Sequence, residues 1–429
     1  MRVYNAPGGN RVDPVWPYLT ADVAPVPARI KWRDEDFVVE EVPLYDPCGS
    51  GDHVYALIEK VGMTTRRAVL EIAQAVGVSS AAIGVAGQKD ARGITRQVVS
   101  VHGADPARIR SLALPGIRIL DTARHRTKLR PGSLRANRFV VRLRETPADR
   151  IGEIDRIVEV LARRGVPNYF GPQRFGMRGD TWEVGRALLC GDFDGAVRLI
   201  VGRPTAGETG AVRRARELAA AGQFGEAARA WPIGFRDCAH LCRLLARMAG
   251  NARRAIFGLD RPVLGFYVSA FQAWLFNRVL AERVPDVDRV LPGDLVFSHL
   301  TGAVLAVEDA EIVQPCAARF EISPTGPIVG YTMSVPRGEP AALEHRIIEE
   351  VGLSPSDLPR TGPLTCVGGR RPLRFRPEGI GCEAGSDGAG PFLELRFTLP
   401  PGCYATSLLR EIGKDQLSEG QIVPDDEEA

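Results

Sequence analysis

The sequence predicts an α+β fold. Stretches rich in β-branched and aromatic residues, such as 37–42 and 53–58, interleave with stretches of helical periodicity, such as 64–76 and 148–163. Between about 177 and 255 the sequence becomes alanine- and arginine-rich with helical spacing. This change of composition indicates a helical domain inserted into the α+β one.

Local signals support the elements of the first half. Thr64 or Thr65 can cap the helix 64–76, and Gly77 is a suitable stop. Residues 96–101 and 139–143 have the composition of strands. The helix 148–163 has one apolar face, formed by Ile151, Ile154, Ile157, Val158 and Leu161.

The second half contains fewer clear elements. A long helix is expected over 268–283, and a strand with alternating apolar residues over 392–399. The glycine- and proline-rich residues 363–391 are interpreted as a connection. Residues 1–27 carry five prolines and are expected to form an extended arm, and 424–429 an acidic tail.

Composition fits a globular protein with two domains. The chain has 429 residues, 45% hydrophobic content and a net charge of +3, so affinity for nucleic acid would depend on local clusters of charge. One run has no compensating acid and indicates a phosphate-binding surface, with a solvated face as the alternative. Its basic residues are Arg124, His125, Arg126, Lys128, Arg130, Arg135, Arg138, Arg142 and Arg144.

The eight cysteines form no C-x₂-C pair, which favours free thiols in a reducing compartment. The one cluster that could bind a metal, Cys238-x-His240-x-Cys242, lacks a second ligand pair and fits a buried helix face better. We therefore predict no metal site. No signal peptide or membrane-spanning stretch is recognised, and the protein is expected to be cytoplasmic.

Asp90 is the candidate with the strongest chemical signal. Its run, Ala86-Gly87-Gln88-Lys89-Asp90-Ala91-Arg92-Gly93, sets a carboxylate among glycines and cations. Glycines let the backbone approach a ligand, and cations can keep the carboxylate ionised and contact phosphate. The pattern indicates chemistry on a polyanion, while a solvated turn remains the alternative interpretation.

Two further runs follow in order, 168–176 (NYFGPQRFG) and 399–411 (LPPGCYATSLLRE). Together with the run around Asp90 they resemble the TruD family of tRNA pseudouridine synthases. The resemblance also includes Asp34-Glu35-Asp36-Phe37-Val38-Val39-Glu40-Glu41, the basic stretch 124–145 and the segment 267–277. It extends over roughly residues 28 to 420.

The resemblance implies a fold and its division. A pseudouridine-synthase core with a mixed, mainly antiparallel sheet would be split between residues 28–176 and 385–423. An inserted, family-specific TRUD domain would occupy 177–384. RNA would bind in the cleft between the two domains.

The resemblance also implies an activity. The chain would be an isomerase that converts a uridine of tRNA, typically uridine-13 of the D arm, to pseudouridine after the base is flipped out. Asp90 would be the catalytic nucleophile, with Lys31 as the first and Lys89 as the second candidate for the cation beside it. No cofactor is needed, and attack at C6 or at C1′ stays open. For Lys31 the alternative is an ordinary solvated lysine.

Four residues are expected to bind the flipped base. Phe37, Phe170 and Tyr404 would provide stacking faces, and the amide of Asn168 would read the uracil edge. Core positions for Phe37, Phe170 and Phe175, and a turn role for Asn168, are the alternatives. Contacts with the RNA backbone are expected from Lys89, Arg126, Lys128, Arg130 and Arg135.

The chain departs from the family pattern at Ala91, Ala136 and Cys403, none of which removes a group that the chemistry needs. An inactive RNA-binding or chaperone protein of the same fold is the competing hypothesis. A zinc-dependent deaminase is disfavoured, because the sequence lacks H-x-E with P-C-x-x-C. The expected partner is tRNA, with no obligate protein partner, and the chain is expected to be a monomer.

Overall fold

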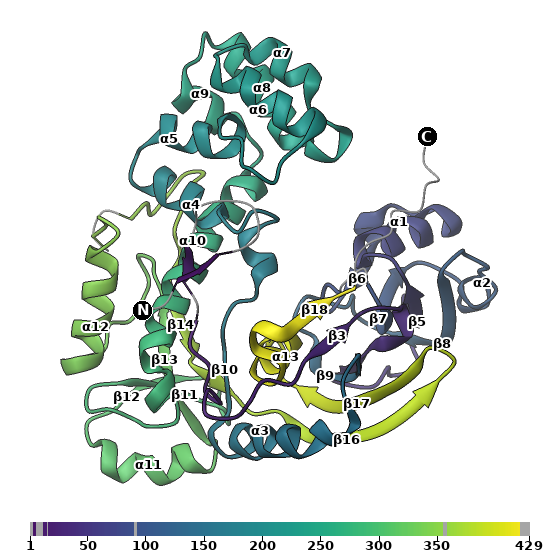
Figure 1. Ribbon diagram of the computed structural model, residues 1–429. Coiled ribbons are helices and arrows are strands. Elements are labelled where there is room, and N and C mark those ends of the chain that lie inside the picture. The colour runs from purple at the N-terminus through teal and green to yellow at the C-terminus, as the bar shows by residue number, and fades with distance from the viewer. Residues whose placement is uncertain (1–2, 6–11, 15, 90–91, 355–357, 421–429) are drawn as a thin grey trace. The chain divides into compact units, whose positions relative to one another are not determined.

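The structure is a computed structural model that describes residues 3–5, 12–14, 16–89, 92–354 and 358–420 (Figure 1). The chain forms two compact units. Unit 1 comprises Met1–Pro17 and Pro167–Arg374, and unit 2 comprises Tyr18–Val166 and Phe375–Ala429. The strands β10 (Val166–Pro167) and β15 (Arg374–Phe375) lie where the chain passes from one unit to the other.

Unit 2 is built on a mixed sheet whose central order is β16-β17-β9-β4-β7-β5-β8. Among the described strand pairs of this sheet, only β4 with β7 and β3 with β18 are parallel, so the sheet is mainly antiparallel, as predicted. Its strands are β3 (Ala28–Ile30), β4 (Phe37–Pro43), β5 (His53–Val61), β6 (Ile83–Val85), β7 (Ile94–His102), β8 (Ile117–His125), β9 (Leu134–Arg144), β16 (Glu378–Asp387), β17 (Gly390–Leu399) and β18 (Leu417–Glu419).

The helices of unit 2 are α1 (Thr65–Val76), α2 (Pro106–Arg110), α3 (Ile151–Arg164) and α13 (Ala405–Gly413). The α1 boundaries confirm the capping prediction: Thr64 Oγ1 accepts the N–H of Arg67, and Gly77 has a left-handed φ of 76°. Ile72 and Val76 of α1 pack with Val54 and Ile58 of β5 in one core. Burial of these apolar side chains holds the helix on the sheet.

Unit 1 is mainly helical. Its helices are α4 (Thr181–Leu189), α5 (Phe193–Val197), α6 (Gly210–Ala220), α7 (Phe224–Ala230), α8 (Arg236–Arg247), α9 (Ala252–Phe257), α10 (Arg261–Arg283), α11 (Ala310–Ala318) and α12 (Gly338–Glu349). The long helix begins seven positions earlier than the sequence predicted, with Asp260 as its N-cap. The helices α5 to α9, residues 193–257, form a group that we call the helical lobe (Figure 1).

The helices α4 and α10 approach closely, and Gly185 permits it. A Cβ atom at Gly185 would lie 2.1 Å from the carbonyl oxygen of Tyr267. Nearby, Trp182 and Trp274 stack with ring centroids 4.1 Å apart. The position tolerates no side chain because the α10 backbone occupies its space.

Unit 1 also contains an antiparallel four-stranded sheet, in the order β12-β11-β13-β14. Its strands are β11 (Leu295–Ser298), β12 (Val304–Ala306), β13 (Ile322–Ile328) and β14 (Gly369–Pro372). At the N-terminus, β1 (Val3–Asn5) pairs with β2 (Val12–Pro14).

The structure differs from two sequence predictions. The interpretation of 363–391 as a connection is wrong, because β14 and β16 lie within it; β16 is stabilised by pairing with β17. The compact units divide at 166/167 and 374/375 rather than at 176/177 and 384/385. Of the predicted arm 1–27, residues 1–17 belong to unit 1 and 18–27 to unit 2, and the predicted tail 424–429 lies outside the described residues.

Candidate active site

Asp90 and Ala91 lie outside the described residues, but both flanks of this pair are described. On the N-terminal side, Lys89 Nζ lies 2.7 Å from Glu41 Oε2 of β4, and both side chains are buried. The Lys89 N–H donates to Thr65 Oγ1 at the start of α1, at 2.9 Å. Lys89 is therefore fixed through its backbone and its side chain.

On the C-terminal side, a hydrogen bond and a close backbone contact fix the position of Gly93. Its N–H donates to Asp34 Oδ1 at 2.8 Å. Its φ is +117°, and a Cβ atom there would lie 2.2 Å from the carbonyl oxygen of Phe37. Both features require glycine at this position.

Lys31 lies in unit 2 at the end of β3, with a left-handed φ of 54°. Its side chain is buried, which rules out the solvated lysine considered from the sequence. Its Nζ lies 4.7 Å from the centroid of the Phe37 ring and 3.5 Å from Glu419 Oε1. Arg92 also faces Glu419, with Nη1 3.8 Å from Oε2. Lys31 and Arg92 thus share one carboxylate.

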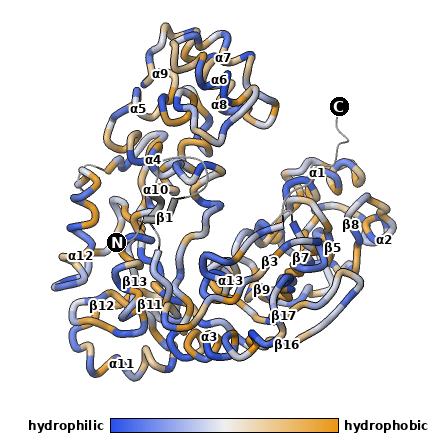
Figure 2. Tube along the Cα trace, in the orientation of Figure 1, coloured by the Kyte–Doolittle hydropathy of each residue, from blue (hydrophilic) through white to orange (hydrophobic). Residues whose placement is uncertain are grey.

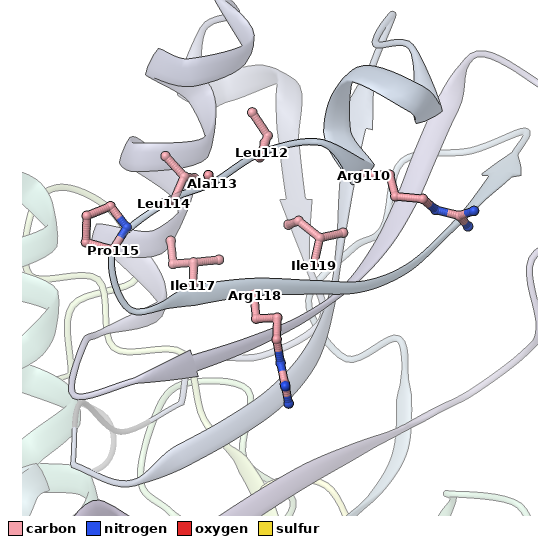
Figure 3. Close-up of a pocket in the computed structure, with 8 residues that line it drawn as sticks. All are labelled: Arg110, Leu112, Ala113, Leu114, Pro115, Ile117, Arg118 and Ile119. Atoms are coloured by element: carbon pink, nitrogen blue, oxygen red, sulfur yellow. The ribbon is translucent and has the colours of Figure 1, made fainter.

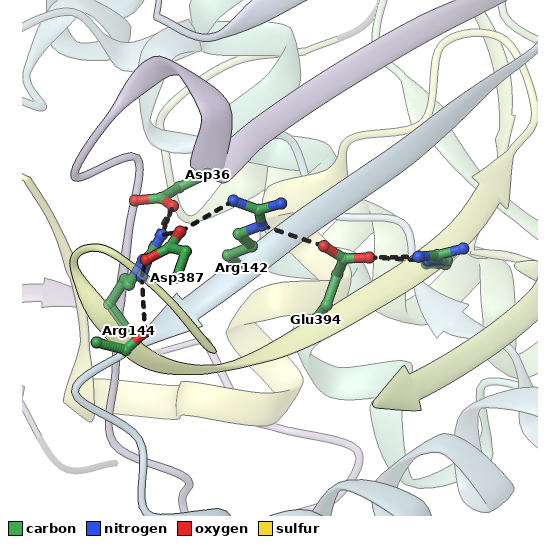
Figure 4. Close-up of polar contacts among 7 residues, drawn as sticks. Asp36, Arg142, Arg144, Asp387 and Glu394 are labelled. Atoms are coloured by element: carbon green, nitrogen blue, oxygen red, sulfur yellow. Dashed lines mark hydrogen bonds and ion pairs between the residues drawn. The ribbon is translucent and has the colours of Figure 1, made fainter. Parts of the chain in front are cut away.

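A buried network supports the turn that carries Asp34 (Figure 4). Arg144 donates from Nε and Nη2 to Asp36 Oδ1, at 2.9 and 2.6 Å, and both side chains are fully buried. Arg144 also donates to both oxygens of Asp387, at 2.8 and 2.6 Å. These hydrogen bonds hold the pKa of Asp387 well below its ordinary value. The network joins the turn to β9 and to the β16–β17 hairpin.

The basic stretch 124–144 contains cations in two kinds of surroundings. Arg138 and Arg142 pair with acids on neighbouring strands, and Arg144 pairs with Asp36 in the turn before β4. Four other cations of the stretch form no ion pair with an acid among the described residues: Arg126, Lys128, Arg130 and Arg135. Their charge is therefore available to a polyanion. Arg126, Arg130 and Arg135 are exposed, and Lys128 is half-buried with its Nζ 2.6 Å from the carbonyl oxygen of Ala81.

Aromatic rings border this basic surface. Tyr45, which is 39% exposed, stacks on His125 with ring centroids 5.2 Å apart. Tyr55 packs against the same imidazole at 4.5 Å. Tyr55 is buried and His125 half-buried, so Tyr45 is the exposed ring of this group. An exposed aromatic ring beside cations is typical of surfaces that bind nucleic acids.

Tyr404 is half-buried and occupies the N-cap position of α13, directly after the turn at Gly402, whose φ is +75°. Ser407 donates its backbone N–H to the Tyr404 carbonyl oxygen at 3.1 Å. The helix start therefore fixes the backbone of Tyr404.

The run 168–176 lies in unit 1. Asn168 is buried; its Nδ2 donates to the Pro372 carbonyl oxygen at 2.9 Å, and its Oδ1 accepts from Arg371 Nη2. Arg371 also lies over the Phe170 ring, with Cζ 4.3 Å from the centroid. Asn277 of α10 pairs with both the N–H and the carbonyl of Phe170, at 2.9 and 3.0 Å. This run is thus locked between α10 and the strand β14.

Comparisons with known proteins identify the family. The model of the tRNA pseudouridine synthase D (TruD) family matches residues 16–412. The chain belongs to the TruD family. A curated tRNA pseudouridine synthase D from Geobacter sulfurreducens is 46% identical over 92% of this chain and 96% of its own. One from Anaeromyxobacter dehalogenans is 36% identical over 93% of this chain and 97% of its own.

A solved structure agrees with the fold. The crystal structure of a TruD protein from Methanosarcina mazei matches with a TM-score of 0.78 and 25% identity. The match covers 93% of this chain and 96% of the other. The predicted family and the predicted α+β class with a mixed sheet are therefore confirmed.

The predicted site residues of this TruD chain fall in both units. Lys31, Phe37, Lys89 and Tyr404 lie in unit 2, and Asn168 and Phe170 in unit 1. Phe37 is only 3% exposed and Phe175 is in the unit 1 core, where the alternative interpretation placed both. The Lys89 ammonium, predicted to contact RNA, is instead close to Glu41 in the structure. The roles of these residues stay predictions.

Sequence reasoning assigned no structural role to several residues that contact the predicted site residues or their surroundings: Asp34, Glu41, Arg144 and Asp387 in unit 2, and Arg371 in unit 1. Asp34 and Glu41 belong to the motif 34–41, and Arg144 belongs to the basic run. The sequence therefore indicated that these residues matter, but it did not show which groups they contact. Arg371 and Asp387 lie in the stretch interpreted as a connection. No local pattern marks their partners.

Other features of the TruD chain do not form a site. A hollow beside β8 is lined mainly by apolar side chains, together with Arg110 and Arg118. Figure 3 shows Ile117 and Ile119 on one side of the strand and Arg118 on the other. Within the described residues, no cluster of His, Cys, Asp or Glu side chains is suited to a metal. Burial raises the pKa of the Cys238 thiol to about 11, and that of Cys242 is also raised. No described helix combines the length and the apolarity needed to cross a membrane.

Proposed function

We propose that this chain is a tRNA pseudouridine synthase that isomerises uridine-13 of the D arm, with Asp90 as the catalytic nucleophile. The observation that carries the activity is family membership over nearly the whole chain, with 46% identity to a curated tRNA pseudouridine synthase D. The target position and the role of Asp90 rest on the matching motif around it.

The flanks of Asp90 support this role. Buried contacts of Lys89 and the hydrogen bond from Gly93 to Asp34 hold both ends of a short segment. Anchors on both sides of a catalytic residue favour a productive orientation in the substrate complex, which lowers the barrier to attack. Arg92 lies two residues after Asp90 in the sequence, and Lys31 shares the carboxylate of Glu419 with Arg92. We propose that these cations favour an ionised Asp90 carboxylate.

The reaction conserves all atoms. The N1–C1′ bond of the flipped uridine breaks, the uracil turns, and a C5–C1′ bond forms. The C5 proton is lost and N1 gains one, so no oxidant, reductant or cofactor is consumed. Asp90 would add transiently to the base or to the sugar and leave unchanged.

The basic surface supports tRNA as the partner. Arg126, Arg130 and Arg135 are exposed, without an acidic partner among the described residues, and Lys128 lies with them. We propose that these four residues contact tRNA phosphates, whereas Lys89 positions the Asp90 segment through Glu41. Tyr45 and His125 offer stacked rings at the edge of this surface.

We assign base recognition to the remaining predicted residues. Tyr404, which is half-buried at a helix start, can reach a base with its ring. Asn168 uses one N–H and its oxygen within the protein, so any contact with uracil is made by its remaining N–H, with Arg371 and Phe170 beside it. Phe37 would stack only through a ring edge or after movement, because it is buried against Lys31 and Phe139.

We propose that unit 2 is the synthase core. We propose further that residues 167–374 of unit 1, which include the run 168–176, are the inserted TRUD domain. We propose that the enzyme acts as a monomer in the cytoplasm. Light scattering of the purified chain, alone and with one equivalent of tRNA, would give one protein copy in both cases; a dimer would contradict the monomer.

The test uses unmodified tRNA transcripts and site-mapped pseudouridine detection. Wild type should form product at position 13 only, and a transcript with cytidine at position 13 should give none. Asp90→Asn should lower turnover by at least about 10³-fold while tRNA binding persists. Asp149→Asn, at an exposed aspartate of the same unit, is the matched control and should retain full activity.

Each failure has a distinct meaning. Product at another position would overturn the assignment of uridine-13 but not the activity. Turnover by Asp90→Asn would overturn the nucleophile. Binding of tRNA without product by wild type would favour an inactive RNA-binding protein of the same fold.

A further inference from the structure

The helical lobe carries a second concentration of positive charge, far along the chain from the basic stretch of unit 2. From residue 229 to 254 the sequence has six arginines and a single acidic residue, Asp237. All six lie on helices: Arg229 on α7, Arg236, Arg243 and Arg247 on α8, and Arg253 and Arg254 on α9. Three consecutive helices therefore carry the charge.

The helix α8 is sharply amphipathic. Its buried face consists of Ala239, Leu241, Cys242, Leu244 and Leu245. Its exposed face carries Arg236, Arg243 and Arg247, with the half-buried His240 between the first two. Spacings of four, three and four residues place these side chains in one row along the helix. Figure 2 shows hydrophilic and hydrophobic residues alternating along this segment.

The arginines of this row form no ion pair within the described part of the lobe. There, the ion pairs join other arginines to acids: Arg213 to Glu217, and Arg216 to Glu208. Arg216 is buried and also donates to the Ile200 carbonyl oxygen, so it serves the lobe's own structure. No ion pair among the described residues includes Arg236, Arg243 or Arg247.

Helix stability explains only one of the three arginines. Arg247 lies in the last turn, where a cation is favourable to the helix dipole. Arg236 is the first residue of α8, where a cation is unfavourable for the same reason. Arg236 therefore lowers the stability of α8 and has no acidic partner among the described residues. A role in binding a molecule outside the chain would explain its charge.

The surroundings extend the basic surface. A hollow between α7 and α8 is lined by Arg229 and Ala246, with Glu226 also on its wall. A second hollow, on the α9 side, is lined by Arg253 and Arg254. Arginines therefore border the C-terminal end of α8 on both sides.

We propose that the α8 row, Arg236, Arg243 and Arg247, is a second tRNA contact that binds the phosphate backbone. This proposal rests on the proposed function, since tRNA is the polyanion that the enzyme would hold. Guanidinium groups pair well with phosphates, and an unpaired basic row gains affinity by releasing counterions from RNA. A membrane surface is disfavoured because the apolar face of α8 is buried in the lobe.

The test compares two triple variants of the full chain. Arg236→Gln/Arg243→Gln/Arg247→Gln removes the row. Arg213→Gln/Arg319→Gln/Arg346→Gln removes the same charge from exposed arginines of unit 1 that already pair with acids. Equilibrium binding to unmodified tRNA is measured over a range of salt concentrations, together with single-turnover pseudouridine formation at saturating tRNA.

The row variant should raise the Kd for tRNA by about tenfold at low salt and reduce the slope of log K against log salt by about 2 to 3. Its turnover at saturating tRNA should match wild type, and the control variant should bind like wild type. Equal Kd and slope for both variants and wild type would overturn the second contact, even if wild type forms product. No product from wild type would instead overturn the proposed function, and binding would still test the row.

Discussion

The carboxylate of Asp34 accepts the backbone N–H of Gly93 at 2.8 Å. This hydrogen bond links the turn Asp34–Asp36 to the segment that begins at Lys89 and contains Asp90. The same turn is attached to β9 by the hydrogen bond from Arg144 to Asp36. A chain of buried and half-buried polar contacts thus connects the strand core to the segment with the proposed nucleophile.

Asp34→Ala should lower kcat by about 10- to 100-fold with little change in KM for tRNA. The Gly93 amide would lose its acceptor, and the Asp90 segment would lose orientation without losing a substrate contact. Asp34→Asn keeps an oxygen acceptor and should restore most of kcat. Steady-state kinetics on tRNA would check this, and an Asn variant as slow as the Ala variant would count against a positioning role.

Glu41→Leu should destabilise the protein by about 3 kcal/mol, because it leaves the Lys89 ammonium buried without a partner. The double variant Glu41→Leu/Lys89→Met removes both charges and should recover most of that loss. Urea denaturation of the three proteins measures the difference. A double variant as unstable as the single one would show that shape, rather than the unpaired charge, determines the cost.

Asp387→Asn should lower Tm at neutral pH, and its difference from wild type should shrink in acid. Arg144 holds the folded-state pKa of Asp387 below its ordinary value. Its carboxylate therefore contributes stability that is present above about pH 4 and is lost as pH falls toward the folded pKa.

Thermal unfolding from pH 7 down to the most acidic pH at which the chain folds would check this. Asp149→Asn, at an exposed aspartate without a described partner, should show no pH-dependent difference from wild type. A constant difference between Asp387→Asn and wild type at all pH values would contradict the ion pair as its source.

Gly185→Ala should destabilise unit 1 by about 2 kcal/mol, because its Cβ would lie 2.1 Å from the Tyr267 carbonyl oxygen and force α4 away from α10. Gly265→Ala, in α10 with open space around the added methyl, is the matched control and should be neutral or slightly stabilising. The measurement is Tm by calorimetry. Equal values for the two variants would mean that the helices separate without cost.

Local sequence signals were sufficient for many elements. Helix α1 starts after Thr64 and ends at Gly77 because a side-chain cap and a left-handed glycine act within a few residues. The strand 392–399 was recognised by its alternation and lies within β17. In contrast, the glycine-rich β16 has no such pattern; it is a strand because β17 provides its hydrogen-bond partners.

The sequence by itself determined the family, the α+β class and the motif around Asp90, because these depend on residue types in order along the chain. Only the tertiary structure decided which cations of the run 124–144 are available. Arg144 is buried because Asp36 and Asp387, 108 and 243 residues away, surround its guanidinium, while Arg126 stays exposed. Likewise, Lys89 meets Glu41 across 48 residues. The pairing of charges that lie far apart in sequence follows from strand order and register, which no local pattern encodes.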